Sequence, residues 1–271
     1  MIFTYWQPDP ENQEAPDCPD GVLAWRQHYP DMALFTQDEA VDALAEFGAP
    51  CVDLFRRIRM PACQSDLARL ALLYRFGGLY VDSHTGPGTV AGLLTIFELL
   101  AANETVLFEK SWELDHGSVP RLVNGVLCAR KRSPVIRLLF ENALRNLASQ
   151  EQKEFELNGF SPYNLAVLSG AWNIRVSLFD MSSKLRVLKD EFLDSVHIKS
   201  LQKRAEDGVL LYRHYGYRKA GRHWSERQHT ERLFLARSKV SDYPSSVSDA
   251  SELSSSPNVE GRQVSPDGAN V

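Results

Sequence analysis

Asp82 and His84 stand two residues apart, directly after the short apolar run 79–81. In an extended segment the side chains at positions i and i+2 project to the same side, so both can contact one divalent cation. A carboxylate and an imidazole suit such a cation when phosphate oxygens complete its coordination shell. In an isolated D-x-H sequence, an aspartate that caps a turn beside a surface histidine is the commoner arrangement, so the interpretation depends on the surrounding residues.

A second pair of chemically useful residues, Asp66 and Arg69, lies one helical turn apart upstream of Asp82. Positions i and i+3 share a helix face, and a guanidinium beside a carboxylate is suited to orienting a sugar diphosphate. The alternative is a surface ion pair that contributes little to stability. The helix that carries the pair is predicted from Ser65, because apolar residues recur at helical spacing, and it ends at the glycines 77–78. Its apolar positions are Leu67, Leu70, Ala71 and Tyr74.

The remaining pattern predicts one α/β domain, because short apolar runs typical of strands alternate with amphipathic helical stretches. Strands are predicted at 1–6, 31–35, 79–81, 105–108, 125–129 and 209–212. Helices are predicted after the capping box Thr36–Glu39 and after Ser133-Pro134 and Ser161-Pro162, where a cap residue precedes a proline. Ligands of open α/β sheets bind at the carboxyl ends of strands, and Asp82 is predicted to lie at one of them.

Composition narrows the class of protein. The 271 residues carry 30 Lys and Arg against 35 Asp and Glu, a net charge of −5, which argues against a nucleic-acid or membrane-surface partner. No apolar run reaches the roughly 20 residues of a membrane span, and the amino terminus lacks the features of a secretory signal. We therefore predict no transmembrane segment and a cytoplasmic location. The four cysteines form no C-x-x-C pair, so free thiols are expected.

The run from Ser65 to His84 strongly resembles the sugar-binding region of glycosyltransferases that carry a D-x-D motif. These include glycosyltransferase family 32 and the catalytic domains of the clostridial glucosylating toxins. Their pattern is S-D-x-x-R, then L-Y-x-x-G-G-x-Y, then D-x-D, and seven or more positions match in register. The resemblance implies a GT-A-like domain with a doubly wound, mostly parallel sheet. We place this catalytic domain at residues 1–238 and predict a disordered, serine-rich tail at 239–271.

The resemblance also implies roles for individual residues. Asp82 and Arg69 would be catalytic, and the metal ligands would be Asp82, His84 and His214. The donor would be bound by Trp6, Asp66, Arg69, Tyr80, Asn124 and Trp224.

The chain departs from the family at His84, where a second aspartate would stand. The polypeptide N-acetylgalactosaminyltransferases use D-x-H to hold manganese, so the change resembles a known variant of the same ligand set. Imidazole is a softer ligand than carboxylate, which favours Mn²⁺ over Mg²⁺ as the divalent cofactor.

The predicted activity is metal-assisted transfer of a hexose from a nucleoside diphosphate sugar donor to a carbohydrate or other hydroxyl acceptor, with the retained configuration of the relatives. One alternative is a non-catalytic nucleotide-sugar binding module with a degenerate D-x-D motif. Another is a hydrolase that transfers the sugar to water.

Overall fold

A computed structural model describes residues 1–8, 18–115, 119–182, 187–211 and 223–236 of the chain. His214 and the predicted tail lie outside these residues. Residues 1–236 form one compact unit.

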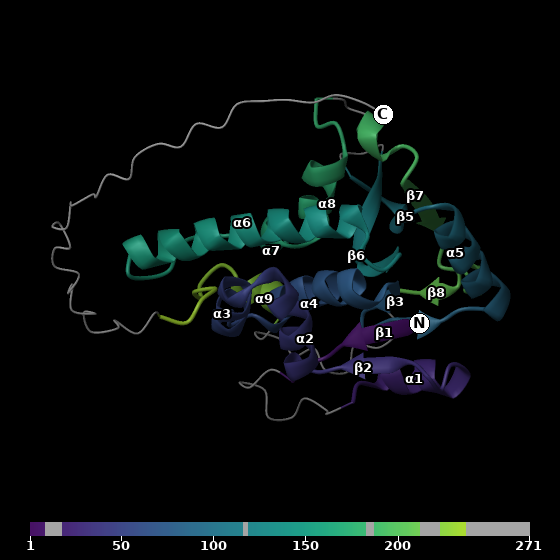
Figure 1. Ribbon diagram of the computed structural model, residues 1–271, viewed down its shortest axis with the longest axis horizontal. Coiled ribbons are helices and arrows are strands. Elements are labelled where there is room, and N and C mark those ends of the chain that lie inside the picture. The colour runs from purple at the N-terminus through teal and green to yellow at the C-terminus, as the bar shows by residue number, and fades with distance from the viewer. Residues whose placement is uncertain (9–17, 116–118, 183–186, 212–222, 237–271) are drawn as a thin grey trace, which may run out of the picture. The chain divides into compact units, whose positions relative to one another are not determined.

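A six-stranded sheet forms the centre of this unit (Figure 1), with the strand order β2-β1-β3-β6-β5-β7. The strands are β1 (Ile2–Tyr5), β2 (Ala33–Phe35), β3 (Gly78–Val81), β5 (Thr105–Asp115), β6 (Val119–Ala129) and β7 (Val196–Leu201). Strand β6 runs antiparallel to both of its neighbours, and the other neighbouring pairs are parallel. The predicted mixed α/β fold with a mostly parallel sheet is thus confirmed.

Helices cover both faces of the sheet. One core cluster contains residues of α2 (Gln37–Leu44), α3 (Ala49–Arg57), α4 (Pro61–Phe76), α6 (Pro134–Glu156) and α8 (Ala171–Leu178). The other contains residues of α1 (Asp20–His28) and α5 (Val90–Ala102). In β3, Tyr80 joins the first cluster and its neighbours Leu79 and Val81 join the second, because successive strand side chains point to opposite faces. The sheet is therefore doubly wound.

Short elements complete the unit. They are β4 (Gly86–Pro87), β8 (Val209–Leu210), α7 (Leu165–Leu168), α9 (Trp224–Arg227) and the 3₁₀ turns η1 (Ala45–Phe47), η2 (Asp190–Phe192) and η3 (Ala205–Asp207). Strand β8 pairs with β4, which begins two residues after His84.

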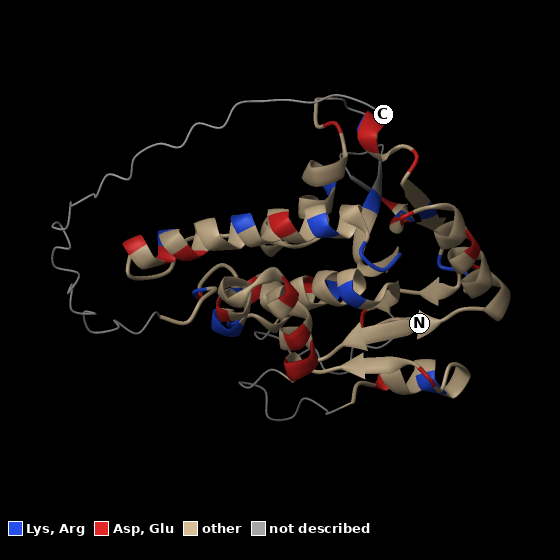
Figure 2. Cartoon of the chain, viewed as in Figure 1, with Lys and Arg blue, Asp and Glu red and all other residues tan. Residues whose placement is uncertain are grey.

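Helix α4 positions the predicted Asp66 and Arg69 in the interior. It begins at Pro61, one turn before the predicted start, because proline suits the first turn of a helix. It ends at Gly77, whose φ of +68° favours glycine, and β3 follows at once. Figure 2 shows charged residues mainly on the helices, whereas β1 and β2 are tan throughout. The buried charges of Asp66 and Arg69 within α4 pair with each other, one helical turn apart.

Two sequence predictions were wrong in detail. No helix follows Ser161-Pro162: the Ser161 carbonyl accepts from the Gln150 amide at 3.0 Å, and α7 begins only after Asn164, whose side chain caps it. Strand β7 was not predicted, because His197 and Lys199 interrupt its apolar residues.

The segment after α9 packs into the core. Leu233 and Phe234 are buried, and their backbone N–H groups donate to the carboxylate of Glu154 on α6 at 2.8 and 3.1 Å. Among the described residues, no helix combines the length and apolarity that crossing a bilayer requires.

Candidate active site

Asp82 lies at the carboxyl end of β3, against β6. Its N–H donates to the Gly125 carbonyl at 2.7 Å, which continues the β3–β6 pairing by one residue. A Cβ atom on Gly125 would lie 2.3 Å from Oδ2 of Asp82. Glycine at position 125 therefore leaves the space that the carboxylate occupies.

The turn that follows Asp82 is fixed by α1. The Asp82 carbonyl accepts from the N–H and hydroxyl of Thr85 at 2.9 and 2.7 Å, and the indole N–H of Trp25 donates to the same hydroxyl at 3.0 Å. A Cβ atom on Gly21 of α1 would lie 1.9 Å from the Ser83 carbonyl oxygen. Helix α1 thus packs directly on the D-S-H turn, which holds Asp82 and His84 in place.

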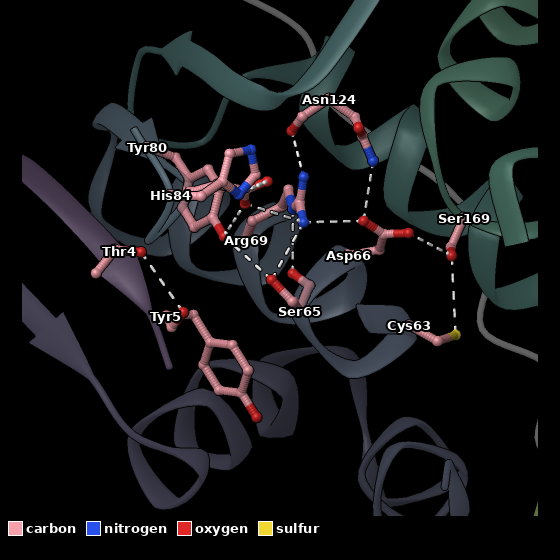
Figure 3. Close-up of polar contacts among 11 residues, drawn as sticks. Thr4, Tyr5, Cys63, Ser65, Asp66, Arg69, Tyr80, His84, Asn124 and Ser169 are labelled. Carbon is pink, nitrogen blue, oxygen red and sulfur yellow. Dashed lines mark hydrogen bonds and ion pairs between the residues drawn. The ribbon is translucent and has the colours of Figure 1, made fainter. Parts of the chain in front are cut away.

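Arg69 is the centre of a buried polar cluster (Figure 3). Its Nη2 lies 2.9 Å from Oδ1 of Asp66 and 3.3 Å from Oδ1 of Asp82, and its Nη1 donates to the Asn124 carbonyl. Its guanidinium also stacks over the Tyr80 ring, 4.9 Å from the centroid. One cation therefore links α4, β3 and β6.

The two carboxylate oxygens of Asp82 have different surroundings. Oδ1 accepts from the Tyr80 hydroxyl at 2.8 Å and faces Arg69, whereas Oδ2 lies 3.8 Å from Nδ1 of His84. Burial raises the pKa of Tyr80 well above its ordinary value, so the hydroxyl stays neutral and can donate. The network fixes one oxygen and directs the other toward His84.

Asp66 sits deeper. Its Oδ1 accepts from the Asn124 amide at 3.0 Å and its Oδ2 accepts from the Ser169 hydroxyl at 2.8 Å. Burial raises the pKa of Asp66 to about 6, and the opposing effects of Arg69 and the Ser169 hydrogen bond keep it from rising further. The carboxyl group is therefore mostly ionised at neutral pH.

Exposure shows which side of the cluster a ligand can reach. The side chains of Asp82 and His84 are 19% and 12% exposed, against 9% and 5% for Asp66 and Arg69. Oδ2 of Asp82 and Nδ1 of His84 are 3.8 Å apart, so these two side chains would be the ones to hold a cation. No group of three or more His, Cys, Asp or Glu suited to a metal occurs within the described ranges, so further ligands must come from elsewhere. Asp82 and His84 would thus supply only part of a cation's coordination shell.

The structure brings six of the predicted site residues together: Asp66, Arg69, Tyr80, Asp82, His84 and Asn124. Two other predicted residues, Trp6 and Trp224, have their described contacts elsewhere. Trp6 follows β1, and its N–H donates to the Phe35 carbonyl at 3.0 Å. Trp224 begins α9 and packs against the first core cluster. The donor contacts of all these residues stay predictions.

Sequence reasoning did not assign roles to Ser65, Gly125 or Ser169. The Ser65 hydroxyl accepts a hydrogen bond from Nη2 of Arg69 and forms another with the Tyr80 hydroxyl, and each is 3.1 Å long. The serine of the S-D-x-x-R pattern was a signal for Ser65. Gly125 and Ser169 come from distant segments, so only the fold shows their contacts.

Comparison with known proteins supports the sequence resemblance. Residues 16–89 match the family described as "Glycosyltransferase sugar-binding region containing DXD motif". This region includes α1, α4, β3 and the D-S-H turn, so the predicted glycosyltransferase sugar-binding region is confirmed there. No curated protein sequence matches the chain significantly.

Solved structures show a weaker likeness. The ligand-free glycosyltransferase domain from the YGT toxin shares 12% identity, with a TM-score of 0.32 over 47% of this chain and 37% of its own. The PaToxG glycosyltransferase shares 12% identity, with a TM-score of 0.35 over 65% of this chain and 66% of its own. The UDP-bound glycosyltransferase domain from the YGT toxin shares 10% identity, with a TM-score of 0.36 over 67% of this chain and 56% of its own. The chain thus spans between about a third and two thirds of these domains, and no residue role is transferred from them.

Proposed function

We propose that this protein transfers a hexose from a nucleoside diphosphate sugar to a hydroxyl acceptor with the help of a divalent metal. The observation that carries the proposal is the Asp82 carboxylate. One of its oxygens is held by Arg69 and Tyr80 while the other faces His84, inside the region that matches the sugar-binding family.

The DXD character of the matched region implies a divalent metal. Asp82 and His84 would hold it, with His214 as a further proposed ligand. The imidazole ligand favours Mn²⁺ over Mg²⁺. When bound, the metal would supply positive charge to the leaving diphosphate.

The protein's own residues orient this site. Arg69 holds Asp82 and Asp66 together, and Tyr80 donates to Asp82, so the carboxylate keeps one orientation before the donor arrives. We further propose that Asp66, Arg69, Tyr80, Asn124, Trp6 and Trp224 contact the donor. Asp66, Arg69 and Asn124 bond to one another, and the Tyr80 hydroxyl bonds to Asp82, so the donor would meet these side chains already held in place.

Two other parts of the proposal rest on the sequence resemblance: retention of configuration, and a carbohydrate or other hydroxyl acceptor. The proposed cytoplasmic location rests on the amino-terminal sequence and on the lack of a long apolar run. Two alternatives to transfer stay open to test. In a binding module the site recognises the donor without turnover, and in a hydrolase water replaces the acceptor.

Donor turnover separates these possibilities. A panel of UDP- and GDP-hexoses is incubated with the protein and Mn²⁺, with and without sugar and protein acceptors, and nucleoside diphosphate release is measured beside calorimetric binding of UDP. Transfer predicts acceptor-dependent release, hydrolysis predicts release that no acceptor changes, and a binding module predicts binding without release. Absence of both binding and release would overturn the proposed function.

Asp82→Ala tests the carboxylate itself. Because Asp82 would be the charged ligand of the proposed metal site, we expect loss of release by about 100-fold or more, with a thermal midpoint within a few degrees of wild type. Turnover retained in a folded Asp82→Ala protein would remove Asp82 from the site.

A further inference from the structure

Ser169 reaches the site from a distant part of the chain. It follows α7, is 4% exposed, and donates its hydroxyl hydrogen to Oδ2 of Asp66 at 2.8 Å, across 103 residues of sequence. Figure 3 shows Ser169 and Arg69 on opposite sides of Asp66, and Arg69 is the residue that contacts Asp82. Ser169 therefore cannot act on a ligand at Asp82 directly.

Hydrogen bonds connect Ser169 to Asp82 in three steps. Ser169 holds Oδ2 of Asp66, Oδ1 of Asp66 accepts from Arg69 at 2.9 Å, and Arg69 lies 3.3 Å from Oδ1 of Asp82. The Asn124 amide also donates to Oδ1 of Asp66, and the Asn124 carbonyl accepts from Arg69. Each atom that orients Arg69 is thus itself oriented by a neighbour.

The backbone around Ser169 allows little adjustment. A Cβ atom on Gly170 would lie 3.3 Å from the Asn124 amide nitrogen and 3.0 Å from Cα of Ala166, so α7 packs closely on the same cluster. Cys63, which is buried, is a further neighbour of Ser169, with its Sγ 3.8 Å from the serine Oγ. If the hydroxyl is removed, Oδ2 of Asp66 keeps no hydrogen-bond donor among the described residues, and an ionised buried oxygen without a donor is unfavourable.

We propose that Ser169 is a positioning residue of the donor site, which holds Asp66 so that Arg69 presents Asp82 to the metal and diphosphate. The proposal rests on the proposed function, because it concerns how that site is prepared for its ligand. Its hydrogen bond also lowers the pKa of Asp66 against the effect of burial, so it favours the ionised partner that Arg69 needs. A purely structural Ser169 would end α7 and fill the core without affecting Asp82.

Ser177 on α8 supplies a matched control. It is also a buried serine, it donates to the Asn173 carbonyl at 2.7 Å and accepts from the Asn142 amide at 2.7 Å, and it belongs to no part of the Arg69 cluster. Ser177→Ala therefore removes comparable hydrogen bonds from the same region of the fold.

The experiment compares wild type with Ser169→Ala, Ser169→Thr and Ser177→Ala in the full chain. Calorimetry measures UDP binding in the presence of Mn²⁺, a turnover assay gives kcat and KM for the best UDP-hexose, and thermal unfolding gives the midpoint. We expect Ser169→Ala to weaken UDP–Mn²⁺ binding by about tenfold and to lower kcat/KM at least as much. Ser169→Thr, which keeps the hydroxyl, should retain most of both, and Ser177→Ala should change only the midpoint.

A double-mutant cycle with Asp66→Asn tests whether Ser169 acts through Asp66. It also keeps the proposal testable if the Ser169→Thr variant does not fold. If Ser169 acts through Asp66, the double variant binds UDP–Mn²⁺ no more weakly than Asp66→Asn alone, whereas Ser177→Ala and Asp66→Asn combine additively. Additive losses for Ser169, or binding by Ser169→Ala equal to that of Ser177→Ala, would overturn the positioning role while the proposed function stands. Failure of wild type to bind UDP at all would instead overturn the proposed function, and this inference with it.

Discussion

At the scale of single residues, the two carboxylate oxygens of Asp82 have different protein neighbours. Oδ1 is held by Tyr80 and Arg69, so only Oδ2 remains directed toward His84. A site built in this way depends strongly on the residue opposite Oδ2. His84 should therefore decide which metal the protein prefers.

Replacement of His84 by aspartate should change that preference. A second carboxylate is a harder ligand than imidazole, so His84→Asp should bind Mg²⁺ better relative to Mn²⁺. It should also lose part of the decline of metal affinity in acid, because imidazole must be neutral to bind a metal. Calorimetry with each metal and UDP at two pH values provides the measurement.

His84→Ala should lose most metal binding, while His28→Ala, at an exposed position on α1, serves as the control. Identical titration curves for wild type and both His84 variants would exclude His84 as a ligand.

Asp66 should give the folded protein a particular pH dependence. Its pKa is raised from 3.8 to about 6, mainly by burial, so the folded state holds this proton more tightly than the unfolded chain. Its contribution to stability is full below about pH 4 and is lost as the pH rises through 6. Relative to wild type, Asp66→Asn should gain up to about 3 kcal/mol in free energy of unfolding between pH 4 and 7.

Urea unfolding of both proteins across this pH range provides the measurement. A stability difference that stays constant with pH would show that Asp66 titrates with an ordinary pKa.

The sequence reveals these residues unevenly. Asp66 and Arg69 could be paired because they lie one helical turn apart, and Asp82 and His84 because they lie two residues apart after a strand. Ser169 and Gly125 could not be connected to them, because their contacts with Asp66 and Asp82 join segments that only the folded sheet brings together. The spacing of residues within α4 also does not show that Arg69 bonds to the Asn124 carbonyl and the Asp82 carboxylate.

At the scale of elements, the β3–β6 pair sets the space available to Asp82. Gly125→Ala would place a methyl group 2.3 Å from Oδ2, so the carboxylate or the strand must move. We expect a loss of about 1–3 kcal/mol in stability and a fall of at least tenfold in donor turnover.

Gly159→Ala provides the control, since the nearest atom to its new Cβ lies 3.5 Å away. Chemical unfolding and the turnover assay distinguish the two variants. Wild-type turnover in Gly125→Ala would show that the Asp82 position is less restricted than the structure indicates.

Elements with strong local signals were predicted from the sequence. The capping box at Thr36–Glu39 does begin α2, and α4 does end at the paired glycines, of which Gly78 already begins β3. The segment after Ser161 fails as a helix because tertiary bonds from Gln150 and Gln228 hold its backbone, which no local pattern shows. The position of α1 on the D-S-H turn was equally inaccessible, since it depends on Gly21 and Trp25 facing a turn 60 residues further on.

At the scale of the whole molecule, two truncations should have opposite results. A chain that ends at Lys239 keeps Leu233 and Phe234 and loses only a segment poor in apolar residues, so its melting temperature should stay within a few degrees. A chain that ends at Thr230 loses both core residues and the two N–H donors of Glu154, which is fully buried. We expect its melting temperature to fall by more than about 10 °C.

Thermal unfolding monitored by circular dichroism compares the two chains with the full-length protein. A large loss of stability in the longer truncation would show that the serine-rich segment contributes to the folded unit.

The long sequence separation within the Arg69 cluster has a consequence for how the protein folds. Arg69 meets Asn124 across 55 residues, and Asp66 meets Ser169 across 103, so the cluster needs contacts between segments that are distant along the chain. Such contacts form late, because the entropy of closing large loops must be overcome first. Helices such as α6 can form before them. A partly folded chain would therefore have native-like helical content before it has a competent donor site, and nucleotide binding would report completion of folding.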